Sequence, residues 1–255
     1  MSSLPVCQVV HLGLVEYRRA WDEQVSLAQA VRDGSQPNTL LLLEHPHVYT
    51  RGRLSKPEHL SLTQAELAGR GVSVVDTDRG GQVTYHGPGQ LVGYPIIDLR
   101  NWGGPLKYLR TLEQVIIQTL ADLSVEAGVI PGLTGVWVGE AKVAAIGVKI
   151  SRGVAYHGFS LNVDPDLSYY NNIVPCGITD RDVTSLEELL ARPVEMELVR
   201  NGLAYRFGQQ MGFRMKEVDM EEVAWGNLSL VGGGIDPGTI VAGGQVNVEA
   251  AKDGL

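Results

Sequence analysis

Apolar residues follow two patterns along the chain, helical spacing and short continuous runs, and these predict a mixture of helices and strands. They follow helical spacing from Leu14 to Arg32, where the run stops at Gly34, and again from Pro105 to Ala127 and from Val194 to Met211. Shorter apolar runs predict strands at residues 7–12, 39–44, 72–76, 91–99, 135–139, 142–150, 154–163 and 213–218.

Two of these strands are predicted to form a hairpin that turns at Ser151-Arg-Gly153. Along the second strand one face is predicted to carry Val154, Tyr156 and Gly158, and the other His157, Phe159 and Leu161. Helices and strands alternate irregularly, with hairpins between them. This order favours an α/β fold of the α+β-like kind, a mixed sheet flanked by helices, over a regular doubly wound sheet.

The length of 255 residues predicts one main domain. We place a single catalytic domain at residues 1–225 and a Gly-rich tail at 226–255. The tail from Gly226 contains no aromatic residue, so it has little apolar surface to bury, and we expect it to be poorly ordered.

The charge balance makes nucleic acid an unsuitable partner, because the net charge is −8 and phosphate binding requires a basic excess. A local basic rim is the exception, with Arg51, Arg53, Lys56 and Arg152 as its candidates. No apolar run approaches the roughly 20 residues that a membrane helix needs, and no signal peptide is recognised. With only two cysteines, no disulfide framework is expected, so we predict a cytoplasmic protein.

The densest motif is the glycine loop, residues 79–93, which reads Arg79-Gly-Gly-Gln-Val-Thr-Tyr-His-Gly-Pro-Gly-Gln-Leu-Val-Gly93. Such glycine density suits a backbone that closely approaches another group, or a tight hairpin connection. The dinucleotide motif fails because Val92 stands at the third glycine position, and the Gly-Lys-Ser/Thr of a phosphate loop is missing. The loop is therefore predicted to hold a neutral or thioester-like group.

Two further features of the sequence are candidates for chemical roles. His45-Pro-His47 suggests a metal ligand pair, but no Cys/His set with ligand spacing accompanies it, so we expect loop or supporting roles. Cys176 lies between Pro175 and Gly177 in a loop, whereas Cys7 lies in an apolar strand and is expected to be core.

Cys176 is either a nucleophile or a buried inert thiol, and a nucleophile needs a nearby cation or base to lower its pKa. The candidates are His86, His157, and Lys142 or Lys149, and spacing along the sequence does not choose among them.

Four motifs resemble the signatures of the lipoyl(octanoyl) transferases, in order and in spacing. They are Arg79–Gln90, Lys142–Gly147, His157–Asn162 and Ile173–Ile178, within a similarity that runs from about residue 12 to 190. The resemblance implies the biotin/lipoate-protein ligase-like fold. It also implies that Cys176 is the acyl-accepting nucleophile and Lys142 its acid/base partner, with His86 and His157 in supporting roles.

The same resemblance implies an acyl pocket with Ile146 and Phe159 as apolar walls. Its expected substrate-binding residues are Arg79, Gly80, Gly81, Gln82, Val83, Thr84, Tyr85, His86, Ala145, Ile146, Gly147, Gly158, Phe159 and Ser160.

The implied activity is ping-pong transfer of an octanoyl group from octanoyl-acyl carrier protein to a lysine of lipoyl-domain proteins, the first step of endogenous protein lipoylation. The acceptors would be the acyltransferase subunits of 2-oxoacid dehydrogenases and the glycine cleavage H protein. The donor group sits on phosphopantetheine, and no ATP or metal is expected. The alternatives are an ATP-dependent lipoate or biotin ligase, a Cys/His hydrolase or amidase using His157 or His86, and a non-catalytic protein-binding domain.

Overall fold

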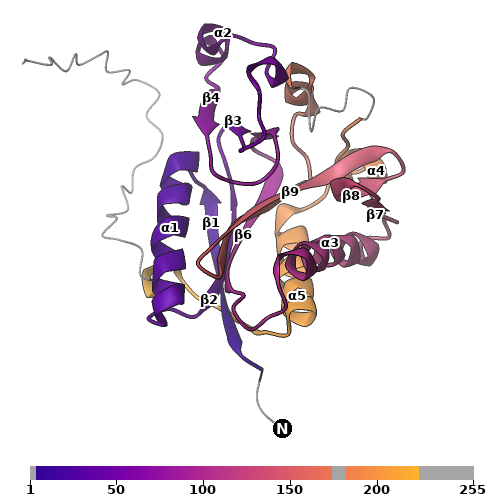
Figure 1. Cartoon of the computed structure of the whole chain (residues 1–255). Helices are drawn as coiled ribbons and strands as arrows, with labels where there is room; N and C mark the ends of the chain where they lie inside the picture. The colour runs from indigo at the N-terminus through magenta and orange to yellow at the C-terminus, as the bar shows by residue number, and fades with distance from the viewer. Residues whose placement is uncertain (1–3, 174–181, 224–255) are drawn as a thin grey trace, which may run out of the picture.

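The computed structural model describes residues 4–173 and 182–223. It shows a large mixed sheet with helices on both faces and a smaller sheet at one end (Figure 1). Cys176 and the tail 226–255 lie outside the described residues, so the predictions about them stay predictions.

The large sheet has the strand order β11-β1-β2-β6-β10-β9-β8-β7. Strand β1 runs parallel to β2 and β11, whereas the other neighbouring pairs are antiparallel. Its strands are β1 (Val6–Leu14), β2 (Asn38–Glu44), β6 (Gln90–Asp98), β7 (Gly128–Ile130), β8 (Leu133–Val138), β9 (Ala141–Ser151), β10 (Val154–Asn162) and β11 (Arg214–Glu217). The predicted mixed sheet is confirmed.

Helices cover both faces of this sheet (Figure 1). One face packs against α1, and the other against α3 and α5. The helices are α1 (Tyr17–Asp33), α2 (Gln64–Gly69), α3 (Pro105–Asp122), α4 (Leu186–Leu190) and α5 (Met196–Met211), with 3-10 turns η1 (Pro57–His59), η2 (Leu167–Asn172) and η4 (Met220–Glu222). Among the described residues, none of these helices combines the length and the apolar character needed to cross a membrane.

The ends of two helices differ from the prediction for local reasons. Helix α1 begins at Tyr17 because Leu14 still pairs with Glu44 in the sheet, and the Glu16 carboxylate caps the helix by accepting from the Arg19 N–H. Helix α3 ends at Asp122 instead of Ala127, and Ser124 has a left-handed φ of 62° that a helix does not tolerate.

The small sheet has the order β4-β3-β5, from β3 (Val48–Arg51), β4 (Ser73–Asp76) and β5 (Val83–His86). Only β4 was predicted, because β3 and β5 have four residues each and β5 lies inside the glycine loop. The sheet packs through an aromatic cluster that includes Tyr49, Tyr85 and Tyr170. It thereby holds the glycine loop beside the large sheet.

The β9–β10 hairpin is confirmed, and its two turn residues Arg152 and Gly153 have the positive φ values of a type I′ turn, 51° and 85°. Phe159 and Leu161 share one face of β10, as predicted, and this face packs under α3 and α5. The prediction that His157 shares this face is wrong. His157 has a φ of 55°, and its ring turns towards α1, where it lies 5.7 Å from the Trp21 ring.

Candidate active site

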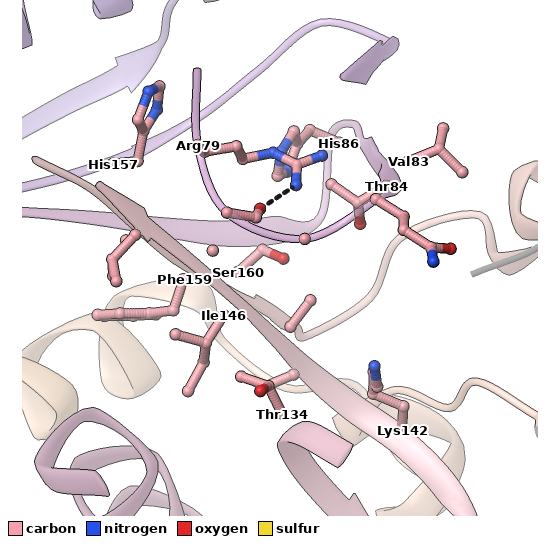
Figure 2. A pocket seen from close by; sticks show the side chains of 18 of the residues that line it. Arg79, Val83, Thr84, His86, Thr134, Lys142, Ile146, His157, Phe159 and Ser160 are labelled. Atoms are coloured by element: carbon pink, nitrogen blue, oxygen red, sulfur yellow. Dashed lines mark hydrogen bonds between the residues drawn. The ribbon is translucent and has the colours of Figure 1, made fainter. Parts of the chain in front are cut away.

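A cavity of about 310 Å³ lies between the glycine loop and the strands β9 and β10 (Figure 2). This volume is at the lower end of the range for small-molecule pockets, roughly 300–1,000 Å³. Every residue predicted for the acyl pocket except Tyr85 lines it: Arg79, Gly80, Gly81, Gln82, Val83, Thr84, His86, Ala145, Ile146, Gly147, Gly158, Phe159 and Ser160. Residues far apart in the sequence are thus brought to one cavity.

Tyr85 is the exception, because its side chain does not line the cavity. Its side chain is fully buried in the small sheet, opposite Tyr49 on the neighbouring strand. The ring stacks on Tyr169 at 4.8 Å, and the hydroxyl lies 2.8 Å from His47 Nδ1. Tyr85 therefore supports the small sheet and does not line the cavity.

Glycines let two stretches of backbone form part of the cavity wall. The Gly80 N–H donates to the Val148 carbonyl at 3.1 Å, and a Cβ on Gly147 would lie only 3.0 Å from the Gly80 carbonyl oxygen. A Cβ on Gly158 would overlap the Gly93 carbonyl of the neighbouring strand. Larger residues would push the glycine loop and the sheet apart, as the glycine density of the sequence suggested.

Arg79 places a buried guanidinium in the cavity wall. Its Nη2 donates to the Thr50 carbonyl at 2.7 Å and to Thr50 Oγ1 at 2.8 Å, and its Nη1 donates to the Gly80 carbonyl at 2.9 Å. The side chain is thus held by the chain around it, and its charge helps to lower the pKa of His86 and of His157.

The apolar wall of the cavity comes from Ile146 and Phe159, which pair directly across β9 and β10. Figure 2 shows both side chains on the same side of the cavity. The Phe159 ring lies over Gly93, where no side chain competes for the space. This wall is suited to an alkyl chain, because burying each methylene contributes roughly 0.8 kcal/mol.

Lys142 stands near the start of β9, with its side chain almost fully buried and lining the cavity. Its Nζ lies 4.7 Å from the centre of the Trp137 ring. Its backbone is held on both sides, since the Lys142 N–H donates to the Asp182 carbonyl and the Thr184 N–H donates to the Lys142 carbonyl. Figure 2 shows Lys142 across the cavity from His157.

His86 is held in one orientation beside the cavity. Its Nδ1 donates to Gln90 Oε1 at 2.6 Å, and its ring stacks on Tyr17 at 5.9 Å. Burial, followed by the neighbouring His45, lowers the pKa of His86 well below its usual value. His86 is therefore neutral at physiological pH.

His157 is tied to Asp78, which also accepts from Tyr156 and from Lys149. The His157 Nε2 donates to Asp78 Oδ1 at 2.7 Å, and Nδ1 is buried. Burial lowers the pKa of His157, although Asp78 partly opposes the shift. Burial alone would raise the pKa of Asp78, but the hydrogen bonds from His157, Tyr156 and Lys149 bring it below its usual value.

His45 and His47 do not form a metal site with the residues around them. His45 donates from Nδ1 to the Val15 carbonyl at 2.6 Å and accepts from the Tyr94 hydroxyl at Nε2. His47 Nδ1 is engaged with the Tyr85 hydroxyl. Within residues 4–173 and 182–223, no group of three or more His, Cys, Asp or Glu side chains could hold a metal ion.

The burial of His45 predicts that the stability of the protein falls in mild acid. Burial lowers the pKa of His45 from 6.5 to about 4. Between these two pH values His45 is therefore protonated in the unfolded chain but neutral in the folded protein. The free energy of unfolding should therefore fall between about pH 6.5 and 4, by about 3 kcal/mol from this residue. Urea unfolding at a series of pH values measures the fall.

The matched variant is His45→Asn, whose Nδ2 replaces the donor to the Val15 carbonyl but does not titrate. Its unfolding free energy should depend less steeply on pH, by up to about 1.4 kcal/mol per unit between pH 6.5 and 4. Equal slopes for the two proteins would contradict this account of His45.

Several cavity residues were not predicted from the sequence. They are Tyr17, Leu54, Tyr94, Gly132, Leu133, Thr134, Ala144, Val148, Asn162, Tyr170 and Val183. Asn162 closes the third motif, so its place in that motif was a usable signal. Tyr17 and Leu54 come from segments whose pairing with the site is not visible in the local sequence.

Comparison with known proteins agrees with these observations. A model of the family described as "Lipoyl protein ligase A/B catalytic domain" matches residues 16–208. The octanoyltransferase of Solibacter usitatus is 50% identical over 210 residues, covering 82% of this chain and 94% of that protein. The octanoyltransferase of Chloroflexus aggregans is 52% identical over 199 residues, covering 76% and 90%.

Solved structures show the same fold. The bi-partite lipoate protein ligase of Thermoplasma acidophilum superposes with a TM-score of 0.67 at 19% identity, covering 84% of this chain and 86% of that chain. A biotin protein ligase from Aquifex aeolicus gives a TM-score of 0.51 at 15% identity, covering 80% and 70%. At these identities the likeness concerns the fold alone, and it confirms the predicted biotin/lipoate-protein ligase-like fold.

The chain therefore belongs to the lipoyl protein ligase A/B catalytic domain family, and within that family to the octanoyltransferases. It is accordingly an enzyme of the acyltransferase class, as its four motifs predicted.

Proposed function

We propose that this enzyme transfers the octanoyl group in two half-reactions through a thioester on Cys176, as the first step of endogenous protein lipoylation. In the first, the Cys176 thiolate adds to the thioester carbonyl of octanoyl-acyl carrier protein. The bond from the carbonyl carbon to the phosphopantetheine sulfur breaks, and the Lys142 ammonium gives its proton to the departing thiolate, which is released as the thiol.

In the second half-reaction the ε-amine of the acceptor lysine adds to the Cys176 thioester. The carbon–sulfur bond breaks, the Cys176 sulfur leaves as a thiolate, and an amide forms. The surplus proton of the amine passes to Lys142, which becomes an ammonium again. One lysine thus serves as acid and then as base.

The observation that carries the proposal is the arrangement of the cavity. Lys142 is almost fully buried in its wall, and Ile146 and Phe159 give the same cavity an apolar surface. A thioester with a medium-length alkyl chain needs both features, a group that moves protons and an apolar space for the chain. The identity of the relatives as octanoyltransferases agrees with this use.

We place the acceptor lysine on lipoyl domains of 2-oxoacid dehydrogenase acyltransferase subunits and on the glycine cleavage H protein. The Thermoplasma acidophilum ligase of the same fold was studied with its E2 lipoyl domain. With two cysteines in the sequence, a reducing compartment suits the thiol, so we place the reaction in the cytoplasm.

The geometry separates the two histidines of the hydrolase or amidase alternative. Such an enzyme needs a ring nitrogen free to accept the proton of Cys176. His157 donates from Nε2 to Asp78, and its accepting nitrogen Nδ1 is buried. His86 donates from Nδ1 to Gln90, which leaves Nε2 as an acceptor, so His86 is the histidine that this alternative would use. We assign supporting roles to both histidines because Lys142 lines the same cavity, and the Lys142→Ala and His86 variants test this choice.

An ATP-dependent ligase is the remaining enzyme alternative, and one experiment separates it from the proposal. A lipoyl domain is incubated with the enzyme and octanoyl-acyl carrier protein without ATP or added metal, and in parallel with free octanoate and ATP. We expect the lipoyl domain to gain one octanoyl group only in the first reaction. Transfer only in the second would assign the protein to ATP-dependent ligation.

A basic rim at the cavity mouth is proposed to dock the carrier protein. Leu54 lines the cavity yet is 66% exposed, which places the segment around it at the mouth, and Arg53 and Lys56 beside it are exposed. Arg51 already pairs with Asp76. Arg152 lies in the hairpin turn at the opposite end of β9 from Lys142, so we remove it from the rim.

Reversing both rim charges, Arg53→Glu with Lys56→Glu, should raise the KM for octanoyl-acyl carrier protein about tenfold and leave kcat nearly unchanged, because rim charges chiefly govern encounter. The matched control is Arg214→Glu, an exposed arginine on β11, which is an edge strand of the large sheet. Steady-state kinetics at low and high salt measure both. An unchanged KM, or an equal rise in the control, would contradict docking at this rim.

A further inference from the structure

Two buried amides face each other where β6 begins and β10 ends. Gln90 and Asn162 are directly opposed in the antiparallel pairing of these strands, and both side chains are buried. Gln90 Nε2 donates to Asn162 Oδ1 at 2.9 Å. We call these two residues the amide pair. The mechanism proposed above gives neither of them a role.

The amide pair holds two segments that are separate in sequence. The Tyr170 hydroxyl lies 2.9 Å from Gln90 Nε2 and donates to Asn162 Oδ1 at 3.2 Å. Asn162 Nδ2 donates to the Thr184 carbonyl at 3.0 Å. Tyr170 precedes residues 174–181 and Thr184 follows them, so one buried asparagine binds the described chain on both sides of that segment.

The same hydrogen-bond network continues to two titratable residues of the cavity, Lys142 and His86. Thr184 donates its N–H to the Lys142 carbonyl at 3.0 Å, and the Lys142 N–H donates to the Asp182 carbonyl at 2.9 Å. On the other side Gln90 Oε1 accepts from His86 Nδ1. The network therefore joins the glycine loop, the end of β10 and the backbone of Lys142.

Only an amide serves at position 162 in this network. The acceptor Oδ1 takes hydrogen bonds from Gln90 and Tyr170, and the donor Nδ2 gives one to a carbonyl oxygen. An aspartate would keep the shape but would set a second oxygen against the Thr184 carbonyl. Because all these groups are buried, an unmatched polar atom is not compensated by water.

We propose that Gln90 and Asn162 are positioning residues for acyl transfer. They act through Tyr170 and Thr184, fixing Lys142 and the residues that flank 174–181 relative to each other. This inference rests on the proposed function, in which Lys142 and Cys176 must meet at one thioester carbon. Such chemistry is sensitive to geometry, since a displacement of about 1 Å can cost on the order of 100-fold in rate.

The test compares three variants in a single-turnover measurement of octanoyl loading from octanoyl-acyl carrier protein. Tyr170→Phe removes one hydroxyl from the network, and Asn162→Asp removes its donor to Thr184. The matched control is Tyr49→Phe, since the Tyr49 hydroxyl also holds η2, through the Tyr169 carbonyl, but does not touch the amide pair.

We expect the maximal loading rate to fall about tenfold in Tyr170→Phe and about 100-fold in Asn162→Asp, with the concentration for half-maximal rate unchanged. The control should load at the wild-type rate. If Asn162→Asp does not fold, as judged by circular dichroism, the pair of tyrosine variants decides the test alone.

Equal loading rates in Tyr170→Phe and wild type would overturn the inference, as would a change in the half-maximal concentration alone or an equal loss in Tyr49→Phe. A wild-type enzyme that gains no octanoyl group would instead refute the proposed function itself. The two failures are therefore distinguishable.

Discussion

Replacing Lys142 by alanine should lower the rate of octanoyl loading by about 10²- to 10⁴-fold, the usual range for losing a general acid/base. Lys142 lines the cavity and is held by backbone hydrogen bonds on both sides, so its removal takes away the proton donor without disturbing the pairing of β9. Intact mass of the enzyme, sampled over time with octanoyl-acyl carrier protein, measures the loading rate.

Lys149→Ala is the matched control, because Lys149 lies on the same strand but pairs with Asp78. It should load at nearly the wild-type rate. A loss of loading in a His157 or His86 variant, with full loading in Lys142→Ala, would contradict the lysine assignment and favour the histidine alternative.

The conservative variant Lys142→Arg tests whether the side chain must exchange a proton. An arginine keeps the positive charge that favours a thiolate but does not give up its proton, so it can serve neither as the acid for the departing sulfur nor as the base for the incoming amine. We expect both loading and transfer to the lipoyl domain to slow. A wild-type rate in either half-reaction would argue against proton transfer by Lys142 in that step.

The second large effect is expected for Cys176→Ser, which should lower octanoyl transfer to a lipoyl domain by on the order of 10³-fold or more. A serine hydroxyl is a far weaker nucleophile than a thiolate unless a base activates it. The mass of the lipoyl domain after incubation with enzyme and octanoyl-acyl carrier protein measures the transfer.

Cys7→Ser is its control, since Cys7 is fully buried in the core and burial raises the pKa of its thiol. This variant should transfer at the wild-type rate wherever it is folded. Transfer that survives Cys176→Ser unchanged would remove the thioester from the mechanism.

Much of the fold follows from local sequence pattern. The long strands β6, β9 and β10 and the helices α1, α3 and α5 have enough residues for their period to be read. The small sheet is harder to predict from the sequence, because β3 and β5 have only four residues each and β3 pairs with strands far along the chain. Their pairing depends on tertiary contacts that a local pattern does not contain.

The site, like the fold, was predictable only in part. The glycine loop and the strand motifs predicted most of the cavity residues. Tyr85 was assigned to the cavity because it lies in the motif, but its side chain packs in the small sheet. The roles of Gln90, Tyr170 and Thr184 arise from hydrogen bonds across 8 to 80 positions of sequence, which no local pattern reveals. The left-handed φ of His157 was equally hidden.

The most direct test of the central claim is the intact mass of the wild-type enzyme after incubation with octanoyl-acyl carrier protein alone, followed by addition of a lipoyl domain. We expect the enzyme first to gain one octanoyl group and then to lose it as the lipoyl domain gains the same mass. An enzyme that stays unmodified while the lipoyl domain becomes octanoylated would contradict the thioester intermediate.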